Sequence, residues 1–175
     1  DLTGIPVQEI PLPDEAVMSL FTSTEALRFA DASLAPDCGT LGLPELGTLM
    51  ARDMVRETRP SSFYDLVQLL GLSHGTDVWK GNAQDLIANG ICSLHEVIGC
   101  RDSIMTGLIQ YGLASKDAFD IMERVRKGKG LLEAQESAMR AAGVPEWYIV
   151  SCNKIKYLFP KAHAAAYAIS ALRIG

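Results

Sequence analysis

The sequence lacks several patterns that mark common classes of protein. None of its four cysteines forms a Cys-x-x-Cys pair, and no Cys/His spacing matches a zinc site. We therefore expect reduced, buried thiols, as in a cytoplasmic protein. The chain also has no run of 18 apolar residues, so no membrane span is expected.

Motifs for catalysis are missing as well. There is no Gly-x-x-x-x-Gly-Lys-Ser/Thr loop, no Gly-x-Gly-x-x-Gly, and no closely spaced aspartate pair that could hold two metal ions. Ser73, His74 and Asp77 are the residue types of a hydrolase triad, but residues this close in sequence seldom reach triad geometry, and no Gly-x-Ser-x-Gly elbow is present. We expect neither a catalytic residue nor a metal ligand in this chain.

The net charge of -5 argues, by itself, against a nucleic-acid partner, because an acidic chain repels phosphate. The charge is unevenly spread, however. Residues 1–60 hold ten acidic and four basic side chains, whereas residues 101–175 hold seven acidic and eleven basic ones. The basic C-terminal part removes the objection to a phosphate-bearing partner.

The composition predicts a folded chain, and its ends indicate a piece of a larger protein. With 175 residues, 48% of them hydrophobic, the chain can build one core. It starts without an initiator Met or a signal peptide and stops at Gly175, inside an apolar, helix-like run. Both ends are typical of an excised fragment.

Helical periodicity dominates and no alternating strand is convincing, so the predicted fold is all-α, with about eight helices and Gly-rich loops. Residues 1–13 are predicted to be a linker, 31–44 a loop and 71–82 irregular. Helices are expected at about 14–20, from Pro44 to beyond 54, at 63–70 with Gly71 as the stop, at 83–88, from Ser93 to 98 or 110, after Ser115 to 127, at 131–142, at 145–157 and from Lys161.

Two basic segments are candidates for binding phosphate. In residues 124–130 (RVRKGKG), four cations lie within six positions and two glycines follow the helix. The cations could simply complement the helix dipole. Alternatively, the glycines let the backbone approach a phosphate that the cations neutralise. In residues 154–163 (KIKYLFPKAH), aromatics that could stack on bases alternate with lysines, although the same aromatics could be core.

The helix from Lys161 is rich in alanine, which allows either another helix or a nucleotide to come close to its backbone. His163 and Tyr167 are four residues apart and share one face of it. The polar loop 73–77 could place side chains near a ligand.

Six runs of residues carry a resemblance to a known family. They are 71–79 (GLSHGTDVW), 81–86 (GNAQDL), 97–102 (VIGCRD), 121–130 (IMERVRKGKG), 144–148 (VPEWY) and 154–167 (KIKYLFPKAHAAAY). In this order they resemble the PolC type of bacterial DNA polymerase III. Residues 161–168 (KAHAAAYA) are also similar to a Lys-Ser-His-Ser-Ala-Ala-Tyr-Ala run of the related replicative polymerases, and residues 20–25 (LFTSTE) resemble the start of the fingers.

The resemblance implies the domain boundaries and the partners. Residues 1–13 would be the linker from the preceding palm, and 14–175 the fingers, incomplete at the C-terminal end. The palm, outside this chain, would bind Mg²⁺ and carry out nucleotidyl transfer in the cytoplasm. DNA template–primer and dNTP would be bound by the whole enzyme, and replisome proteins such as the sliding clamp would bind other regions.

For the fingers, the resemblance and the charges together give twelve candidate residues for binding nucleotide or DNA. Arg124, Arg126, Lys127 and Lys129 are expected to face the triphosphate or the template backbone, and the helix from Lys161 to Tyr167 to line the pocket of the nascent base pair. The remaining candidates are His74, Thr76, Arg101, Lys154, Lys156 and His163. Two alternatives stay open, a stand-alone helical nucleic-acid-binding module and a helical domain whose basic patch meets an acidic protein.

Overall fold

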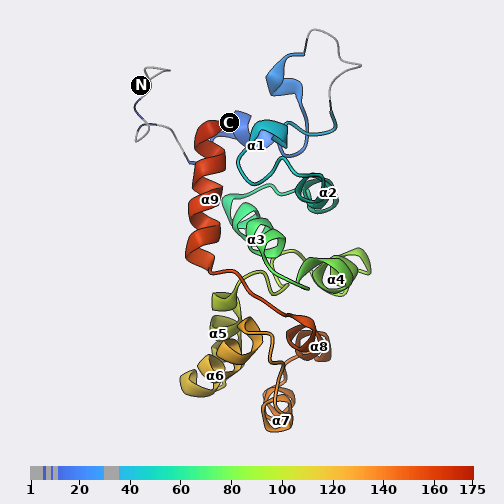
Figure 1. The fold of residues 1–175 in the computed structure, drawn as a ribbon, viewed down its shortest axis with the longest axis vertical. Helices are drawn as coiled ribbons and strands as arrows, with labels where there is room; N and C mark the ends of the chain where they lie inside the picture. The colour runs from blue at the N-terminus through green and yellow to red at the C-terminus, as the bar shows by residue number, and fades with distance from the viewer. Residues whose placement is uncertain (1–5, 7–8, 10–11, 30–35) are drawn as a thin grey trace. The chain divides into compact units, whose positions relative to one another are not determined.

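The structure is a computed structural model that describes residues 6, 9, 12–29 and 36–175 (Figure 1). These residues form nine α-helices, short single-turn elements and one isolated β-bridge. Apart from that bridge, the described part contains no β-structure. The all-α prediction is therefore confirmed. Most of the predicted linker 1–13, and the first part of the predicted loop 31–44, lie outside the described residues. In the described ranges, every helix is too short or too polar to cross a bilayer.

The chain divides into two compact units. The first comprises residues 1–69 and 165–175, and the second comprises residues 70–164. Both boundaries fall inside helices, one in α3 (Phe63–His74) and the other in α9 (Lys161–Ile174).

The first unit contains α1 (Glu15–Ser19), α2 (Leu49–Thr58) and the start of α3. Its core includes Phe21, Leu46, Met54 and Leu66, all fully buried. Ser62 caps α3. The Ser62 hydroxyl accepts a hydrogen bond from the Asp65 amide at 3.2 Å, and the Asp65 carboxylate accepts one from the Ser62 amide at 2.9 Å.

The expected helix start at Pro44 is wrong. Helix α2 begins five residues later, at Leu49, where the Thr48 side chain accepts a hydrogen bond from the amide of Ala51. Glu45 has a φ of 65°, which no α-helix accommodates. Residues 44–47 therefore form a turn that precedes the helix.

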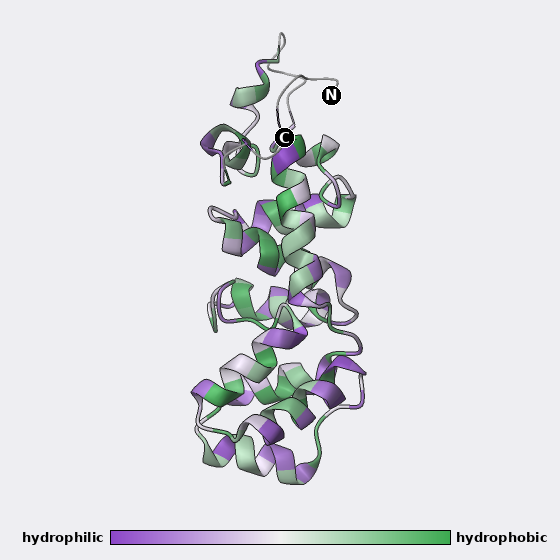
Figure 2. Ribbon diagram, turned by 90° about the vertical axis from the view of Figure 1, so that its left-hand side faces the viewer, coloured by the Kyte–Doolittle hydropathy of each residue, from purple (hydrophilic) through white to green (hydrophobic). Residues whose placement is uncertain are grey.

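The second unit contains α4 (Gln84–Ala88), α5 (Arg101–Gln110), α6 (Ser115–Arg126), α7 (Glu133–Ala141) and α8 (Glu146–Lys154). Helices α5 and α6 pack together as a hairpin. Ala118, Ile121, Met122 and Val125 of α6 are buried, the spacing of one helix face. Figure 2 shows this alternation of hydrophobic and hydrophilic residues along the helices.

Gly71 does not stop α3, which continues to His74, so this prediction is wrong. The residue is Gly because another segment packs directly on it. A Cβ placed at Gly71 would lie 2.4 Å from the Sγ of Cys100 and 2.6 Å from the carbonyl oxygen of Gly99. Beyond the helix, the irregular segment includes a π-type turn at Trp79–Ala83.

Two further helix predictions need correction. The Glu96 carboxylate accepts hydrogen bonds from the Ser93 amide and hydroxyl at 2.8 and 2.7 Å, but this capping arrangement closes a single turn, and the next helix begins at Arg101. Helix α8 ends at Lys154 rather than near Tyr157, because Ile155 is extended and the chain that follows pairs with another segment.

Candidate nucleic-acid interface

The extended segment 155–160 brings separate parts of the second unit together. Tyr157 pairs with Thr76 in an isolated antiparallel bridge. The Thr76 amide donates to the Tyr157 carbonyl at 3.0 Å, and the Lys156 amide donates to the Thr76 carbonyl at 3.0 Å. The polar loop after α3 is thus joined through its main chain to the basic segment after α8.

The end of α6 contacts the same segment through Gly128. The Gly128 amide donates to the Val125 carbonyl at 2.9 Å and the Lys129 amide to the Arg124 carbonyl at 3.0 Å, which is a Schellman C-cap with Gly128 at φ 68°. A Cβ at Gly128 would lie 2.5 Å from the carbonyl oxygen of Lys156. The group that comes close to this glycine is therefore the main chain of Lys156.

Two side chains hold the rest of this loop. Arg124 Nε donates to the Gly130 carbonyl at 3.2 Å, and Arg124 Nη2 donates to the Lys129 carbonyl at 3.4 Å. The Asn153 Oδ1 accepts from the Leu131 amide at 2.8 Å. The guanidinium of Arg124 thus donates hydrogen bonds to the main chain of the loop that carries Lys129. These bonds fix the position of that lysine.

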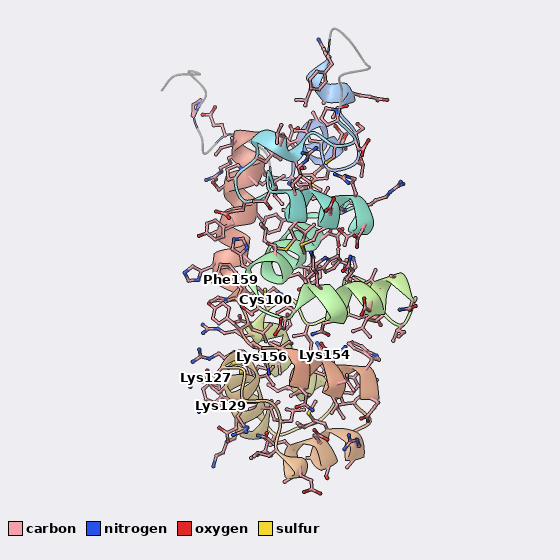
Figure 3. All side chains as sticks on the ribbon, turned by 45° about the vertical axis from the view of Figure 1, so that its right-hand side comes forward. Cys100, Lys127, Lys129, Lys154, Lys156 and Phe159 are labelled. Atoms are coloured by element: carbon pink, nitrogen blue, oxygen red, sulfur yellow. The ribbon has the colours of Figure 1, made fainter. Side chains whose placement is uncertain are left out.

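We call Lys127, Lys129 and Lys156 the basic face. All three side chains are exposed, and Figure 3 shows them at neighbouring positions where α6 ends beside the segment after α8. In the described part of the chain, the ammonium groups of Lys129 and Lys156 have no carboxylate partner. They are therefore available to an external anion.

Glu123 partly neutralises this region. Its carboxylate pairs with Arg126, and Lys127 Nζ lies 2.8 Å from Glu123 Oε2. The hydrogen bond from Arg126, followed by that from Lys127, lowers the pKa of Glu123 to about 2. Glu123 in turn raises the pKa of Arg126. All of these groups are charged at neutral pH, and the end of α6 keeps a net positive charge.

Three rings form a second cluster around Phe159 of the same segment. The His74 ring stacks on Phe159, with centroids 4.7 Å apart, and the edge of Phe159 meets His163 at 5.8 Å. His74 Nδ1 lies 2.8 Å from the Leu70 carbonyl oxygen, which can only accept, so Nδ1 carries a proton.

The start of α9 is fixed beside this cluster. The Lys161 amide donates to Asp102 Oδ2 at 2.8 Å, and the Arg101 amide donates to the Phe159 carbonyl at 3.1 Å. Asp102 therefore supplies a side-chain cap for a helix nearly 60 residues away in sequence.

Most of the twelve candidate residues meet within the second unit. The main chain of 155–158 joins Lys127, Lys129, Lys156 and Thr76, while His74 and His163 share Phe159. Lys154 is turned elsewhere, because its Nζ donates to the Gly81 carbonyl at 2.6 Å. Tyr167 follows His163 by one turn of α9 and belongs to the first unit.

Sequence reasoning missed three residues that shape this region, Glu123, Asn153 and Asp102, and it noted Phe159 only as one of the aromatics of segment 154–163. Only Glu123 had a local signal, since it precedes Arg126 by three positions and Lys127 by four on one helix. The partners of Asn153 and Asp102 are distant in sequence, and so is His74, which stacks on Phe159.

No metal cluster accompanies the basic face. Across the described residues, no three His, Cys, Asp or Glu side chains gather closely enough to hold an ion. The side chains present do not fit a two-metal centre, which requires several carboxylates around a shared position.

Comparison with known proteins identifies the family. Residues 2–144 match the family described as the bacterial DNA polymerase III alpha subunit finger domain. Over 99% of its length the chain is 59% identical to the PolC-type DNA polymerase III of Listeria welshimeri, and 56% identical to those of Pediococcus pentosaceus and Bacillus subtilis. It spans about 12% of each of these relatives. The chain therefore belongs to the finger-domain family of the bacterial DNA polymerase III alpha subunit.

Proposed function

We propose that this chain is the fingers portion of a replicative DNA-directed DNA polymerase and that its basic face binds phosphates of the incoming dNTP or of the template–primer. The observation that carries the proposal is the contact between Gly128 and Lys156, which gathers lysines from two distant segments. Palm residues outside this chain would bind Mg²⁺ and perform nucleotidyl transfer.

The electrostatics support binding of phosphate. Lys129 and Lys156 are exposed and have no carboxylate partner among the described side chains, so binding an anion breaks no existing ion pair. Lysine binds phosphate as a point charge, and each neutralised phosphate releases counterions from DNA. Arg124 contributes indirectly, because its guanidinium holds the main chain of the lysine-bearing loop.

The ring cluster has a separate proposed role at the nascent base pair. His163 is exposed in the first turn of α9 and contacts Phe159, on which His74 stacks. Ala162, next to His163, is also exposed, and its small side chain lets a flat base approach closely. Tyr167, which belongs to the first unit, is proposed as a separate candidate for contacting the nucleotide.

Steady-state kinetics of the whole polymerase test the proposal. The double substitution Lys127→Ala with Lys129→Ala should raise the KM for dNTP or lower kcat at least tenfold, equivalent to about 1.4 kcal/mol. Lys116→Ala is the matched control, since Lys116 is an exposed lysine at the opposite end of α6 and should leave both constants unchanged. Unchanged kinetics in the double variant, with the protein folded, would remove these lysines from the site.

The absence of catalysis from the chain itself is tested directly. The purified 175-residue chain, supplied with Mg²⁺, dNTPs and primed DNA, should give no primer extension. Measurable extension would show that the catalytic carboxylates are not confined to another part of the protein.

A further inference from the structure

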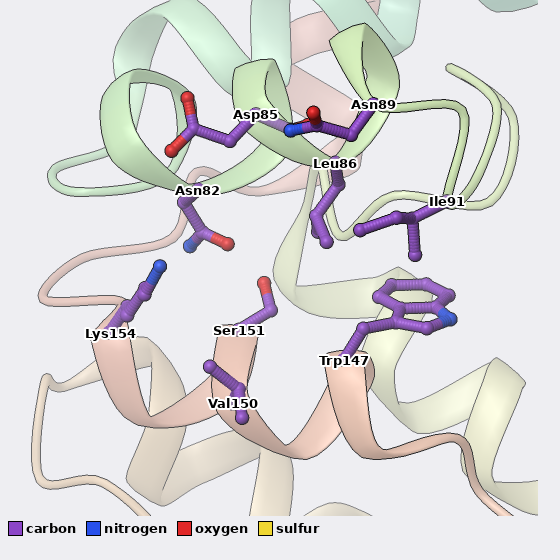
Figure 4. A pocket seen from close by; sticks show the side chains of 9 residues that line it. All are labelled: Asn82, Asp85, Leu86, Asn89, Ile91, Trp147, Val150, Ser151 and Lys154. Carbon is purple, nitrogen blue, oxygen red and sulfur yellow. The ribbon is translucent and has the colours of Figure 1, made fainter.

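A small pocket lies between the π-type turn at 79–83, α4 and α8 (Figure 4). Its volume is about 160 Å³. Leu86, Ile91 and Trp147 supply apolar walls, and Lys154 also lines it. None of these residues belongs to the basic face or to the ring cluster.

Two buried polar side chains open into this pocket. Asn82 is 3% exposed and Ser151 is 4% exposed. Asn82 Nδ2 donates to the Asp77 carbonyl at 3.0 Å, but in the described part of the chain neither Asn82 Oδ1 nor Ser151 Oγ has a hydrogen-bond partner. Figure 4 shows both side chains extending into the space between α4 and α8. Both oxygens can therefore hydrogen-bond a ligand in the pocket without giving up a partner within the protein, which favours a ligand with complementary polar edges.

Lys154 connects the pocket to the basic face. Its Nζ is held by the Gly81 carbonyl at 2.6 Å, and an ammonium group has two further N–H donors and a full positive charge. Lys156, two residues further along the chain, belongs to the basic face. Lys154 therefore supplies a positive charge at the pocket, two residues before a lysine of the basic face.

We infer that this pocket binds one unpaired nucleobase of single-stranded DNA, with the base against the Trp147 indole and its polar edge toward Asn82 Oδ1 and Ser151 Oγ. The inference rests on the proposed function, because the basic face would hold the phosphates of the same strand. The volume is well below the range of about 300–1,000 Å³ for pockets that enclose a whole small-molecule ligand, which favours a flat base over a complete nucleotide.

Photo-crosslinking in the whole polymerase tests this site. The probe is a single-stranded oligonucleotide in which 5-iododeoxyuridine replaces single thymidines, irradiated on the enzyme and followed by peptide mapping. Crosslinks should map to Trp147. Trp147→Ala should abolish them and weaken single-strand binding about 5- to 150-fold, the range given by base–aromatic stacking of about 1–3 kcal/mol, whereas Trp147→Phe should retain most of the affinity.

Tyr111→Ala is the control, because Tyr111 is an exposed aromatic outside the pocket. It should change neither the crosslink nor the affinity, and thermal melting of each variant confirms that it is folded. Crosslinks that avoid Trp147, with unchanged affinity in a folded Trp147→Ala variant, would overturn the inference.

Variants of the basic face separate the two possible failures. If Lys129→Ala with Lys156→Ala weakens DNA binding but no crosslink reaches Trp147, the pocket assignment alone is wrong. If that double variant binds DNA normally, the proposed function fails, and the pocket assignment that depends on it fails too.

Discussion

Gly128 packs against the main chain of Lys156 so closely that a Cβ on Gly128 would lie 2.5 Å from the Lys156 carbonyl oxygen. This single contact fixes the end of α6 to the segment after α8. Lys127 and Lys129, on either side of Gly128, are thereby placed beside Lys156. The same glycine has a φ of 68° and completes the C-cap of α6, so two independent requirements exclude a side chain.

Gly128→Ala should therefore destabilise the protein by about 2–5 kcal/mol, from about 1–2 kcal/mol for the left-handed backbone and about 1–3 kcal/mol for overpacking. Gly143→Ala is the control, because Gly143 has a φ of 79° but nothing within 4 Å of the added Cβ. It should lose only the backbone contribution. Denaturant unfolding measures the free energy of unfolding of both variants. Equal losses of stability would show that the Lys156 main chain leaves room for a side chain at position 128.

Glu123→Gln should strengthen DNA binding by the whole polymerase. The substitution removes the carboxylate that pairs with Arg126 and Lys127, so both cations become available to phosphate. The slope of log K against log [salt] should steepen by about 0.9 for each additional phosphate that the protein neutralises. Glu133→Gln, at an exposed position in the first turn of α7, should leave the slope as it is. Equal slopes in the two variants would contradict a role for these cations.

The ionisation of Glu123 gives a pH-dependent prediction. Its pKa in the folded chain is about 2, below the unfolded value of about 4.3, so the pair stabilises the fold above the unfolded pKa. That contribution should be lost as the pH falls from about 4.3 toward 2. Carboxyl carbon NMR should show Glu123 titrating near pH 2, and Arg126→Ala should move the midpoint upward. A midpoint near 4.3 in the unmodified chain would exclude the pairing.

Asp102→Ala should destabilise the protein by about 1 kcal/mol, because the Lys161 amide at the start of α9 loses its side-chain acceptor. Asp102→Asn keeps an acceptor oxygen and should lose less. Asp120→Ala, at an exposed position on α6, serves as the control. Thermal unfolding of the three variants checks the order, and a loss as large in Asp120→Ala would rule out the capping role.

Local sequence patterns predicted much of the fold, and contacts across the chain account for the errors. The periodicity of α6 and the Gly after Lys127 predicted both the helix and its end, because both signals lie within a few residues. Gly71 was predicted to stop α3. Its role is instead to leave room for Cys100 and Gly99, which pack against it and are distant in sequence. Tyr157 was predicted to be helical because its pairing with Thr76 leaves no local signal.

The candidate site shows the same division. The cations of 124–130 and 154–161 could be selected from charge alone. The sequence could not show that Arg124 turns back onto its own loop, or that Lys154 is held by Gly81 73 residues away. The sequence also gave no reason to expect the ring of His74 beside the rings of Phe159 and His163. That contact depends on the path of segment 155–160.

The most direct test of the central claim is the salt dependence of DNA binding by the whole polymerase carrying Lys129→Ala, Lys156→Ala or both. If the two lysines form one phosphate-binding face, each single variant should reduce the slope of log K against log [salt] by about 0.9, and the double variant by about 1.8. Lys116→Ala should leave it unchanged. A slope in the folded double variant equal to that of the unmodified enzyme would contradict the account.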